Sequence, residues 1–251
     1  MYKSTTKEEA TMLRQALAKG ERINVRSKVG SNPTYIIRPD ELTDEEKNAV
    51  FGAVYFVGLS AFVQNPSKEM EEDIAEHLFQ EEVLMITFSN EIDWRNVAVG
   101  SPRAIAFLGY RDMKVGNDNM LYISGICVDP SYQGKGIGSA LMCEAYKRGT
   151  YQITSLRTQN PVMKQAFDKI IGGSSYPNGV KVPQDIKEIG SLLADTFGVK
   201  DYDANSLCCH NTYGSSLYGI EIDSYNDDNL NTKFNSIDRD EGDALFCIKR
   251  V

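Results

Sequence analysis

Residues 133–138 read Gln-Gly-Lys-Gly-Ile-Gly, a composition and spacing that suit the binding of an anion. The preceding run, Met120 to Val128, is apolar, β-branched and aromatic and carries no charge, which predicts a buried strand. After it, Ile137, Leu141 and Ala145 recur on one face of a predicted helix. A helix start presents unbonded N–H groups and the positive end of the helix dipole, and glycines let a bulky anion approach the backbone. We therefore expect a loop that binds a pyrophosphate, although an ordinary tight turn between a strand and a helix would use similar residues.

Two well-known phosphate-binding loops do not match this stretch. A P-loop needs a lysine and then a serine or threonine directly after its last glycine, whereas Gly138 is followed by Ser139 with no lysine between them. The dinucleotide-binding fingerprint needs G-x-G-x-x-G, and the alternating Gly134, Gly136 and Gly138 do not have that spacing.

The stretch from Val128 to Leu141 resembles motif A of the GNAT acetyltransferase superfamily. In that motif a strand ends in V-x-P and is followed by Q/R-x-x-G-x-G/A, and Gln133, Gly136 and Gly138 occupy the diagnostic positions. The resemblance implies that acetyl-CoA binds here as cosubstrate. The loop N–H groups would hold the pyrophosphate, and the strand end would pair with the pantetheine arm and the thioester carbonyl. The residues implied are Gln133, Gly134, Lys135, Gly136, Ile137, Gly138 and Ser139 in the loop, and Ile126, Cys127 and Val128 on the strand.

A second stretch, residues 151–172, resembles the next pattern of the same family. That pattern is a strand, an asparagine, a helix with an aromatic residue and then a glycine, and Asn160, Phe167 and Gly172 fall in those places. The resemblance implies that Asn160 and Phe167 belong to the cofactor site, with Asn160 on the pantetheine or its neighbourhood. By residue type alone, Asn160 is also a helix N-cap, and both roles can hold together.

The catalytic groups are less well defined by the sequence. Many family members have a tyrosine at the position of Phe167, where its hydroxyl protonates the departing CoA thiolate, and phenylalanine has no proton to give. We expect Tyr213 or Tyr218 to supply that hydroxyl, while the competing interpretation makes the tyrosine-bearing segment a structural cap over the sheet. The predicted motif A strand carries no acid to act as general base, so a water chain or a backbone carbonyl would take the proton. His77 and Cys127 are interpreted as core-edge and core residues, not as a base and a nucleophile.

Hydrophobic periodicity predicts the elements that position these residues. The expected fold is α/β, with a GNAT-like mixed, mainly antiparallel sheet flanked by helices. Residues 1–32 are predicted to be an N-terminal helical extension and residues 33–251 an acyltransferase domain, in which residues 174–242 are an elaborated C-terminal insertion. Expected helices cover 7–19, 40–64, 67–80, 137–148, 160–171 and 184–197. Expected strands cover 35–38, 83–88, 104–110, 120–128, 151–158 and 243–251, with a hairpin loop at 113–119 and an acidic loop at 223–240.

Charge and cysteine content exclude several classes of function. A net charge of −8 and a pI of about 4.9 argue against a nucleic-acid partner and are compatible with a cationic substrate. The five cysteines fit no zinc spacing. The one cluster of soft ligands consists of Cys208, Cys209 and His210, and no further ligand lies near it in the sequence. We therefore predict no metal. Reduced cysteines predict a cytoplasmic protein, and no apolar run predicts a membrane span.

These observations together predict an acetyl-CoA-dependent N-acetyltransferase. By the family's mechanism, a primary amine of a small molecule or a protein attacks the thioester directly in a ternary complex. A homodimer is compatible with the sequence. The alternatives left open are a non-catalytic acyl-CoA-binding sensor or scaffold, and transfer of a larger acyl group.

Overall fold

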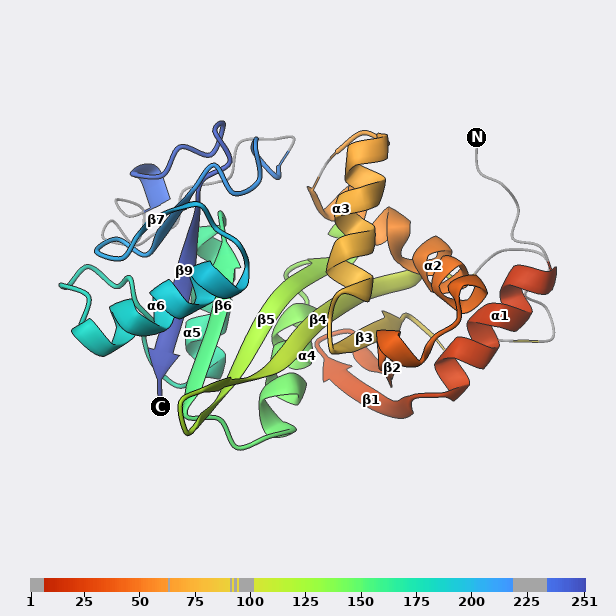
Figure 1. Cartoon of the computed structure of the whole chain (residues 1–251). Coiled ribbons are helices and arrows are strands. Elements are labelled where there is room, and N and C mark those ends of the chain that lie inside the picture. Colours follow the sequence, from red (N-terminus) through yellow and green to blue (C-terminus); the bar gives the residue numbers. More distant parts are fainter. Residues whose placement is uncertain (1–6, 63, 91, 93, 95–101, 219–233) are drawn as a thin grey trace. The chain divides into compact units, whose positions relative to one another are not determined.

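The computed structural model describes residues 7–62, 64–90, 92, 94, 102–218 and 234–251 (Figure 1). The chain forms two compact units. The first unit comprises Met1–Arg111 and Ser124–Ala145, and the second comprises Asp112–Ile123 and Tyr146–Val251. We describe each unit by itself. The sequence-based boundaries at residues 32, 174 and 242 stay predictions.

The first unit begins with helix α1 (Lys7–Ala18), the strands β1 (Glu21–Ser27) and β2 (Gly30–Ile37), and the short helix η1 (Pro39–Glu41). Helices α2 (Asp44–Phe62) and α3 (Lys68–Phe79) follow, and then strands β3 (Val83–Phe88) and β4 (Ala104–Val115), the last of which enters the second unit after Arg111. The unit also holds the end of β5 (Asp118–Val128), the short helix η3 (Pro130–Tyr132) and most of α4 (Ile137–Lys147). Strands β1, β2, β3 and β4 pair antiparallel in that order.

The second unit holds the start of β5, then β6 (Ile153–Thr158), α5 (Pro161–Ile170), α6 (Gln184–Thr196), β7 (Asp201–Asp203), β8 (Cys208–His210) and β9 (Ala244–Arg250). Strand β6 runs parallel to β5 on one side and antiparallel to β9 on the other. Strand β9 pairs with β8, and β8 pairs with β7, both antiparallel.

The described strands form a nine-stranded sheet in the order β1-β2-β3-β4-β5-β6-β9-β8-β7. The β5–α4–β6 connection is the predicted parallel crossover, and every other pair whose register is defined is antiparallel. The mixed, mainly antiparallel α/β fold with an N-terminal helix is confirmed.

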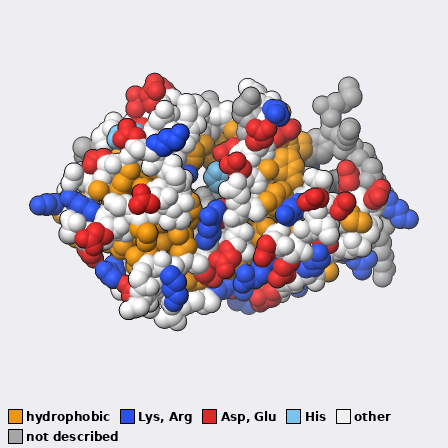
Figure 2. Space-filling view, viewed as in Figure 1, with side chains coloured by type: hydrophobic (Ala, Val, Ile, Leu, Met, Phe, Trp, Pro, Cys, Tyr) orange, Lys and Arg blue, Asp and Glu red, His pale blue; other side chains and the backbone are white. Residues whose placement is uncertain are grey.

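The first unit packs α1, α2 and α3 on its strands. Leu13 and Leu17 of α1 lie in the same core as Val50 and Val54 of α2, so the N-terminal helix belongs to the body of the unit. Helix α2 starts with the predicted capping box: the Thr43 N–H donates to Glu46 Oε2 at 2.8 Å, and the Glu46 N–H donates to Thr43 Oγ1 at 3.3 Å. In Figure 2 hydrophobic side chains also reach the surface around α2, whose partly buried apolar residues are Phe51, Tyr55, Phe56, Ala61 and Phe62.

The second unit has a core of its own. Met120 and Tyr122 of β5 pack with Phe246 and Ile248 of β9, and the inward face of α6 covers them. That face consists of Ile186, Ile189, Leu193 and Ala194, three of which the sequence periodicity predicts. Among the described residues, no helix combines the length and the apolar character needed to cross a membrane.

Three local expectations are wrong. Strand β1 lies within the predicted helical extension, and its mostly exposed, charged residues gave no buried pattern. Strands β4 and β5 extend through the predicted loop at 113–119 and leave only the turn at Gly116 and Asn117, where Gly116 has φ 60°. Strands β7 and β8 lie in a stretch where no strand was predicted, because three-residue strands show no periodicity. Most of the expected acidic loop at 223–240 lies outside the described residues.

Candidate functional site

The end of β5 and the loop after it are joined by local hydrogen bonds. Ile126, Cys127 and Val128 are the last residues of β5, and the next N–H, of Asp129, donates to the Ile105 carbonyl of β4 at 2.9 Å. The Gln133 side chain reaches back and donates from Nε2 to the Val128 carbonyl at 3.0 Å. The glutamine of the predicted motif thus holds the loop against the strand end.

Glycines at two positions let this loop turn. Gly134 has φ 69° and Gly136 has φ 85°, a left-handed conformation that side chains with a Cβ rarely adopt. A Cβ added at either position would meet no heavy atom within 4 Å, so both glycines border open space. Gly138, by contrast, is close-packed, because a Cβ there would come within 3.3 Å of Ile126 and 3.4 Å of Val128. The three alternating glycines therefore serve two purposes: two shape an open loop, and the third lets α4 approach β5.

The N–H groups from Gly134 to Ser139 have no hydrogen-bond acceptor within the described part of the chain. Preceding N–H groups are used: Ser131 donates to the Asp129 carboxylate, and Gln133 donates to the Pro130 carbonyl. The next N–H that is bonded belongs to Ala140, which donates to the Gly136 carbonyl at 3.0 Å and so begins the helical pattern. The free groups lie at the N-terminus of α4, where the helix dipole favours negative charge. This is a site for an anionic group.

Lys135 lies in the loop, but its side chain folds back onto it. Its Nζ donates to the Ser131 carbonyl and sits 5.1 Å from the centre of the Tyr132 ring. Its backbone carbonyl accepts from the Lys28 N–H at 2.9 Å, which ties the loop to the segment after β1. Lys135 therefore adds positive charge beside the free N–H groups while helping to fix the loop.

Cys127 is a core residue, as expected. It is 4% exposed, and burial, with a further contribution from the Asp73 carboxylate, raises the pKa of its thiol far above the ordinary value. The thiol stays protonated at neutral pH, so it is not suited to attack a thioester.

His77 of α3 lies against the β5 backbone in the first unit. A Cβ built on Gly125 would come within 3.3 Å of His77 Cδ2, so the glycine makes room for the imidazole ring. His77 Nδ1 is 2.9 Å from the Asp73 carbonyl, and because a carbonyl only accepts, Nδ1 carries the proton. In the neutral ring this leaves the Nε2 lone pair available as a base. The sequence gave no signal for this, since the contact joins distant segments.

Asn160 is the N-cap of α5, as predicted. Its Oδ1 accepts from the Val162 N–H at 2.9 Å, and its Nδ2 donates to the Tyr218 hydroxyl at 3.3 Å. Phe167 of the same helix is 1% exposed and lies in the interior. The structure therefore brings Asn160 and Tyr218 together and buries Phe167.

Tyr213 lies on Arg157 of β6. The Arg157 Nε donates to the Tyr213 hydroxyl at 3.1 Å, and the guanidinium carbon lies 4.9 Å from the centre of the ring. The hydroxyls of Tyr213 and Tyr218 thus each accept a hydrogen bond in the second unit, one from Arg157 and the other from Asn160. A tyrosine hydroxyl can donate as well as accept a hydrogen bond.

The pairing of β5 with β6 stops before either strand ends. The register runs from Met120 opposite Ile153 to Ile123 opposite Leu156, while β6 continues to Thr158 and keeps its pairing with β9.

A comparison with protein families matches residues 95–167 to the acetyltransferase (GNAT) domain. The chain carries a GNAT acetyltransferase domain. The matched range contains the free N–H groups from Gly134 to Ser139, the end of β5, and Asn160 and Phe167, so the predicted motif residues all belong to the GNAT domain. Tyr213 and Tyr218 lie beyond the matched range.

Solved structures that match the GNAT domain are distant. The NatC complex bound to Gag peptide and CoA is 17% identical and matches over 55% of this chain and 82% of that chain, with a TM-score of 0.37. A Corynebacterium glutamicum structure described as histone acetyltransferase HPA2 and related acetyltransferase is 12% identical over 61% and 89%, with a TM-score of 0.39. An aminoglycoside acetyltransferase from an uncultured soil metagenomic sample, in complex with sisomicin, is 14% identical over 55% and 84%, with a TM-score of 0.37. At these scores the likenesses carry no argument about the acceptor. No curated protein matches the chain.

Proposed function

We propose that this protein is an acetyl-CoA-dependent N-acetyltransferase that acts on a primary amine. The observation that carries the proposal is the row of free N–H groups from Gly134 to Ser139 at the start of α4, directly after the end of β5. Such a row fits a pyrophosphate, because several donors and a helix dipole act on one anion. The strand residues Ile126, Cys127 and Val128 would pair with the pantetheine arm.

The reaction would be a direct transfer. The neutral amine attacks the thioester carbon, a backbone N–H near Val128 holds the oxyanion, the C–S bond breaks, and the thiolate leaves. The attacking nitrogen must lose a proton, and the leaving sulfur must gain one.

His77 is the candidate we propose for the base. Its Nδ1–H is fixed on the Asp73 carbonyl, which leaves Nε2 to accept the proton, and the Gly125 backbone of β5 borders the ring. The Asp73 carboxylate, 3.6 Å from Nδ1, lies where it stabilises an imidazolium once Nε2 is protonated. This replaces the water chain or backbone carbonyl expected from the sequence.

Tyr213 and Tyr218 are the candidates we propose for the acid. Each hydroxyl is held by a hydrogen bond from a neighbouring side chain, from Arg157 for Tyr213 and from Asn160 for Tyr218, and a phenol O–H can protonate a leaving thiolate. The acceptor would be an amine of a small molecule or of a protein, and the net charge of −8 favours a cationic one. A panel of amines of different charge tests this preference: rates that do not depend on acceptor charge or on salt would contradict it.

The competing function is a sensor or scaffold that binds acyl-CoA without turning it over. The buried Phe167 and the absence of an acid between Met120 and Val128 of β5 favour it. Thermal shift with acetyl-CoA, combined with an assay of CoA release over an amine panel, separates the two functions. For a transferase we expect a thermal shift and CoA release with some amine. For a sensor we expect the shift without release.

The control for binding is a pair of variants with matched strain. Gly136→Trp fills the open side of the loop, and Gly116→Trp places the same side chain on another open glycine of positive φ, in the turn between β4 and β5. We expect the acetyl-CoA shift to vanish in the first variant and to persist in the second. A shift that is equal in both would contradict the assignment of the loop.

The proton-transfer candidates are tested by His77→Gln, Tyr213→Phe and Tyr218→Phe, with Tyr176→Phe as the control. General acid or base catalysis is worth roughly 100-fold to 10,000-fold, so the responsible variant should lose at least that much in kcat. If all variants keep wild-type rates, these assignments are wrong, while binding to the loop is unaffected.

A further inference from the structure

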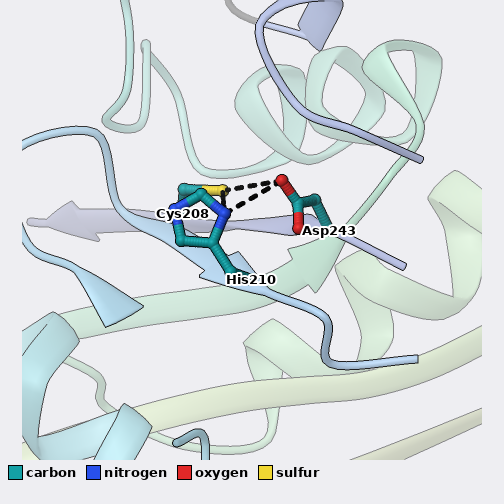
Figure 3. A group of neighbouring side chains, drawn as sticks. All are labelled: Cys208, His210 and Asp243. Atoms are coloured by element: carbon teal, nitrogen blue, oxygen red, sulfur yellow. Dashed lines mark hydrogen bonds and ion pairs between the residues drawn. The ribbon is translucent and has the colours of Figure 1, made fainter. Parts of the chain in front are cut away.

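Three side chains that no part of the proposed reaction uses converge at one end of the second unit: Cys208, His210 and Asp243 (Figure 3). Cys208 and His210 are the first and last residues of β8, and alternation along a strand places them on the same face. Cys209, between them, points to the other face and lies in the core with Phe246. Asp243 comes from the segment directly before β9, and the pairing of Cys208 with Leu245 brings it alongside β8.

The three donor atoms have the separations that a tetrahedral zinc ion requires. Cys208 Sγ lies 3.6 Å from His210 Nδ1 and 3.8 Å from Asp243 Oδ2, and Nδ1 lies 3.0 Å from Oδ2. Zinc bond lengths and tetrahedral angles give edges of about 3.6 Å for S···N, about 3.5 Å for S···O and about 3.3 Å for N···O. All three observed edges are within a few tenths of an ångström of these values.

The surroundings fix the carboxylate and leave one side of the cluster open. Asp243 Oδ1 accepts from the Asn211 N–H at 3.0 Å, and Oδ2 also accepts from the Asp238 N–H at 3.1 Å. Backbone donors of this kind orient a ligating carboxylate in metal sites. The side chain of Asp243 is 8% exposed and that of His210 is 40% exposed, while Cys208 is buried. A fourth ligand could therefore enter on the His210 side.

The arrangement does not fit a nucleophilic cysteine. In a Cys-His-Asp relay the two ring nitrogens of the histidine face different partners, whereas here Nδ1 faces both Sγ and Oδ2. Burial, followed by the Asp243 carboxylate, raises the pKa of the Cys208 thiol to about 12. The remaining alternative is a purely hydrogen-bonded cluster, in which Nδ1–H and S–H both donate to Oδ2.

We propose that Cys208, His210 and Asp243 bind a zinc ion, with the fourth position open to water or an external ligand. The donor set of one thiolate, one imidazole and one carboxylate is of borderline softness, and it favours zinc over magnesium or calcium. The bound ion would join β8 to the start of β9. This inference differs from the sequence-based expectation of no metal, and it is independent of the proposed transferase activity.

The test uses untagged full-length protein stripped with a chelator and then titrated with Zn²⁺ or Co²⁺. We expect near-stoichiometric zinc by elemental analysis after desalting and a raised melting temperature. With Co²⁺ we expect a thiolate-to-cobalt charge-transfer band and the intense visible bands of a tetrahedral site. The variants are Cys208→Ser and His210→Gln, and the matched control is Cys209→Ser, which removes the neighbouring thiol on the opposite face.

The two ligand variants should lose the charge-transfer band and the zinc, and the control should keep both. His210→Gln is the variant that should disturb the fold least, because His210 is the most exposed of the three residues. Its loss of metal binding therefore cannot be attributed to unfolding. If stripped wild-type protein binds neither ion, or if Cys208→Ser gives the same cobalt spectrum as wild type, the proposal is overturned and the cluster is a hydrogen-bonded one.

Discussion

The loop from Gly134 to Ser139 and the cluster of Cys208, His210 and Asp243 use their polar groups in opposite ways. In the loop, consecutive backbone N–H groups have no acceptor in the described protein, and the two open glycines beside them border free space. In the cluster, the Asp243 carboxylate accepts from two backbone N–H groups and from two side chains. Unused backbone donors indicate a place for an anion, whereas the hydrogen-bonded Asp243 carboxylate is already oriented and contributes to the stability of the fold with or without a bound metal ion.

The difference also separates the effects that substitutions should have. A change in the loop should weaken ligand binding and leave stability largely intact. A change in the cluster should lower stability first. The predictions below run from the largest expected effect to the smallest.

Gly136→Val should abolish measurable binding of CoA. The variant strains a residue at φ 85° and disturbs neighbouring N–H groups, and losing two charge-assisted contacts costs about 3–6 kcal/mol, which is on the order of 100-fold or more in affinity. Titration calorimetry measures the loss. Gly116→Val, at φ 60°, is the control for strain and should bind CoA like the wild type.

Asp243→Ala should cost about 2–5 kcal/mol of stability, because two partly buried hydrogen bonds from the Asn211 and Asp238 N–H groups to a charged acceptor are lost. Chemical denaturation in the presence of a chelator measures this loss without any contribution from a metal. Asp240→Ala, on an exposed residue of the same segment, is the control and should be neutral. Equal denaturation midpoints for the two variants would contradict the stabilising role of the Asp243 hydrogen bonds.

Asn160 is the N-cap of α5 and is also expected to contact the cofactor. Two substitutions separate these two roles. Asn160→Ala removes the N-cap of α5 and should cost about 1 kcal/mol. Asn160→Asp keeps the acceptor for the Val162 N–H, so the stability of the fold should be retained. The same substitution removes the Nδ2 donor that contacts Tyr218. If Asn160 also contacts the cofactor, the aspartate variant binds CoA more weakly. Wild-type affinity in both variants would leave only the N-cap role.

Glu46 gives the smallest effect, and it depends on pH. Burial acts to raise the pKa of its carboxyl, but hydrogen bonds from Lys19 and from the Thr43 N–H outweigh burial, so the pKa lies below the ordinary 4.5. The carboxylate therefore stabilises the fold above pH 4.5, and this contribution is lost as the pH falls through the lowered pKa. Glu46→Gln should lower stability by about 1 kcal/mol at neutral pH, and it should flatten the acidic side of the stability profile. If the stability of the variant and that of the wild type change in parallel with pH, the role of the Glu46 carboxylate is contradicted.

Local features of the sequence were sufficient to predict the loop. The buried strand, the turn and the helix at residues 120–148 are neighbours along the chain, and the positive φ at Gly134 and Gly136 is a property of glycine itself. The same holds for the capping box at Thr43 and for the N-cap at Asn160. Longer strands such as β3 were predicted at their observed bounds for the same reason.

Contacts between distant segments could not be predicted in this way. Asp243 meets Cys208 across 35 residues, and His77 meets Gly125 only because α3 packs on β5. Strands β7 and β8 are too short for a pattern, so the face shared by Cys208 and His210 was not visible. Strand β1 is an edge strand with charged residues, which gives no sign of burial. In each case tertiary pairing, and not local propensity, fixes the structure.

Amide hydrogen exchange of the loop from Gly134 to Ser139 tests the central claim most directly. These N–H groups should exchange rapidly in the free protein, because they have no acceptor, and they should become protected when CoA binds. An acetylated pantetheine that lacks the pyrophosphate should give no such protection. Protection in the free protein, or bound CoA that leaves the exchange of these amides unchanged, would contradict the account.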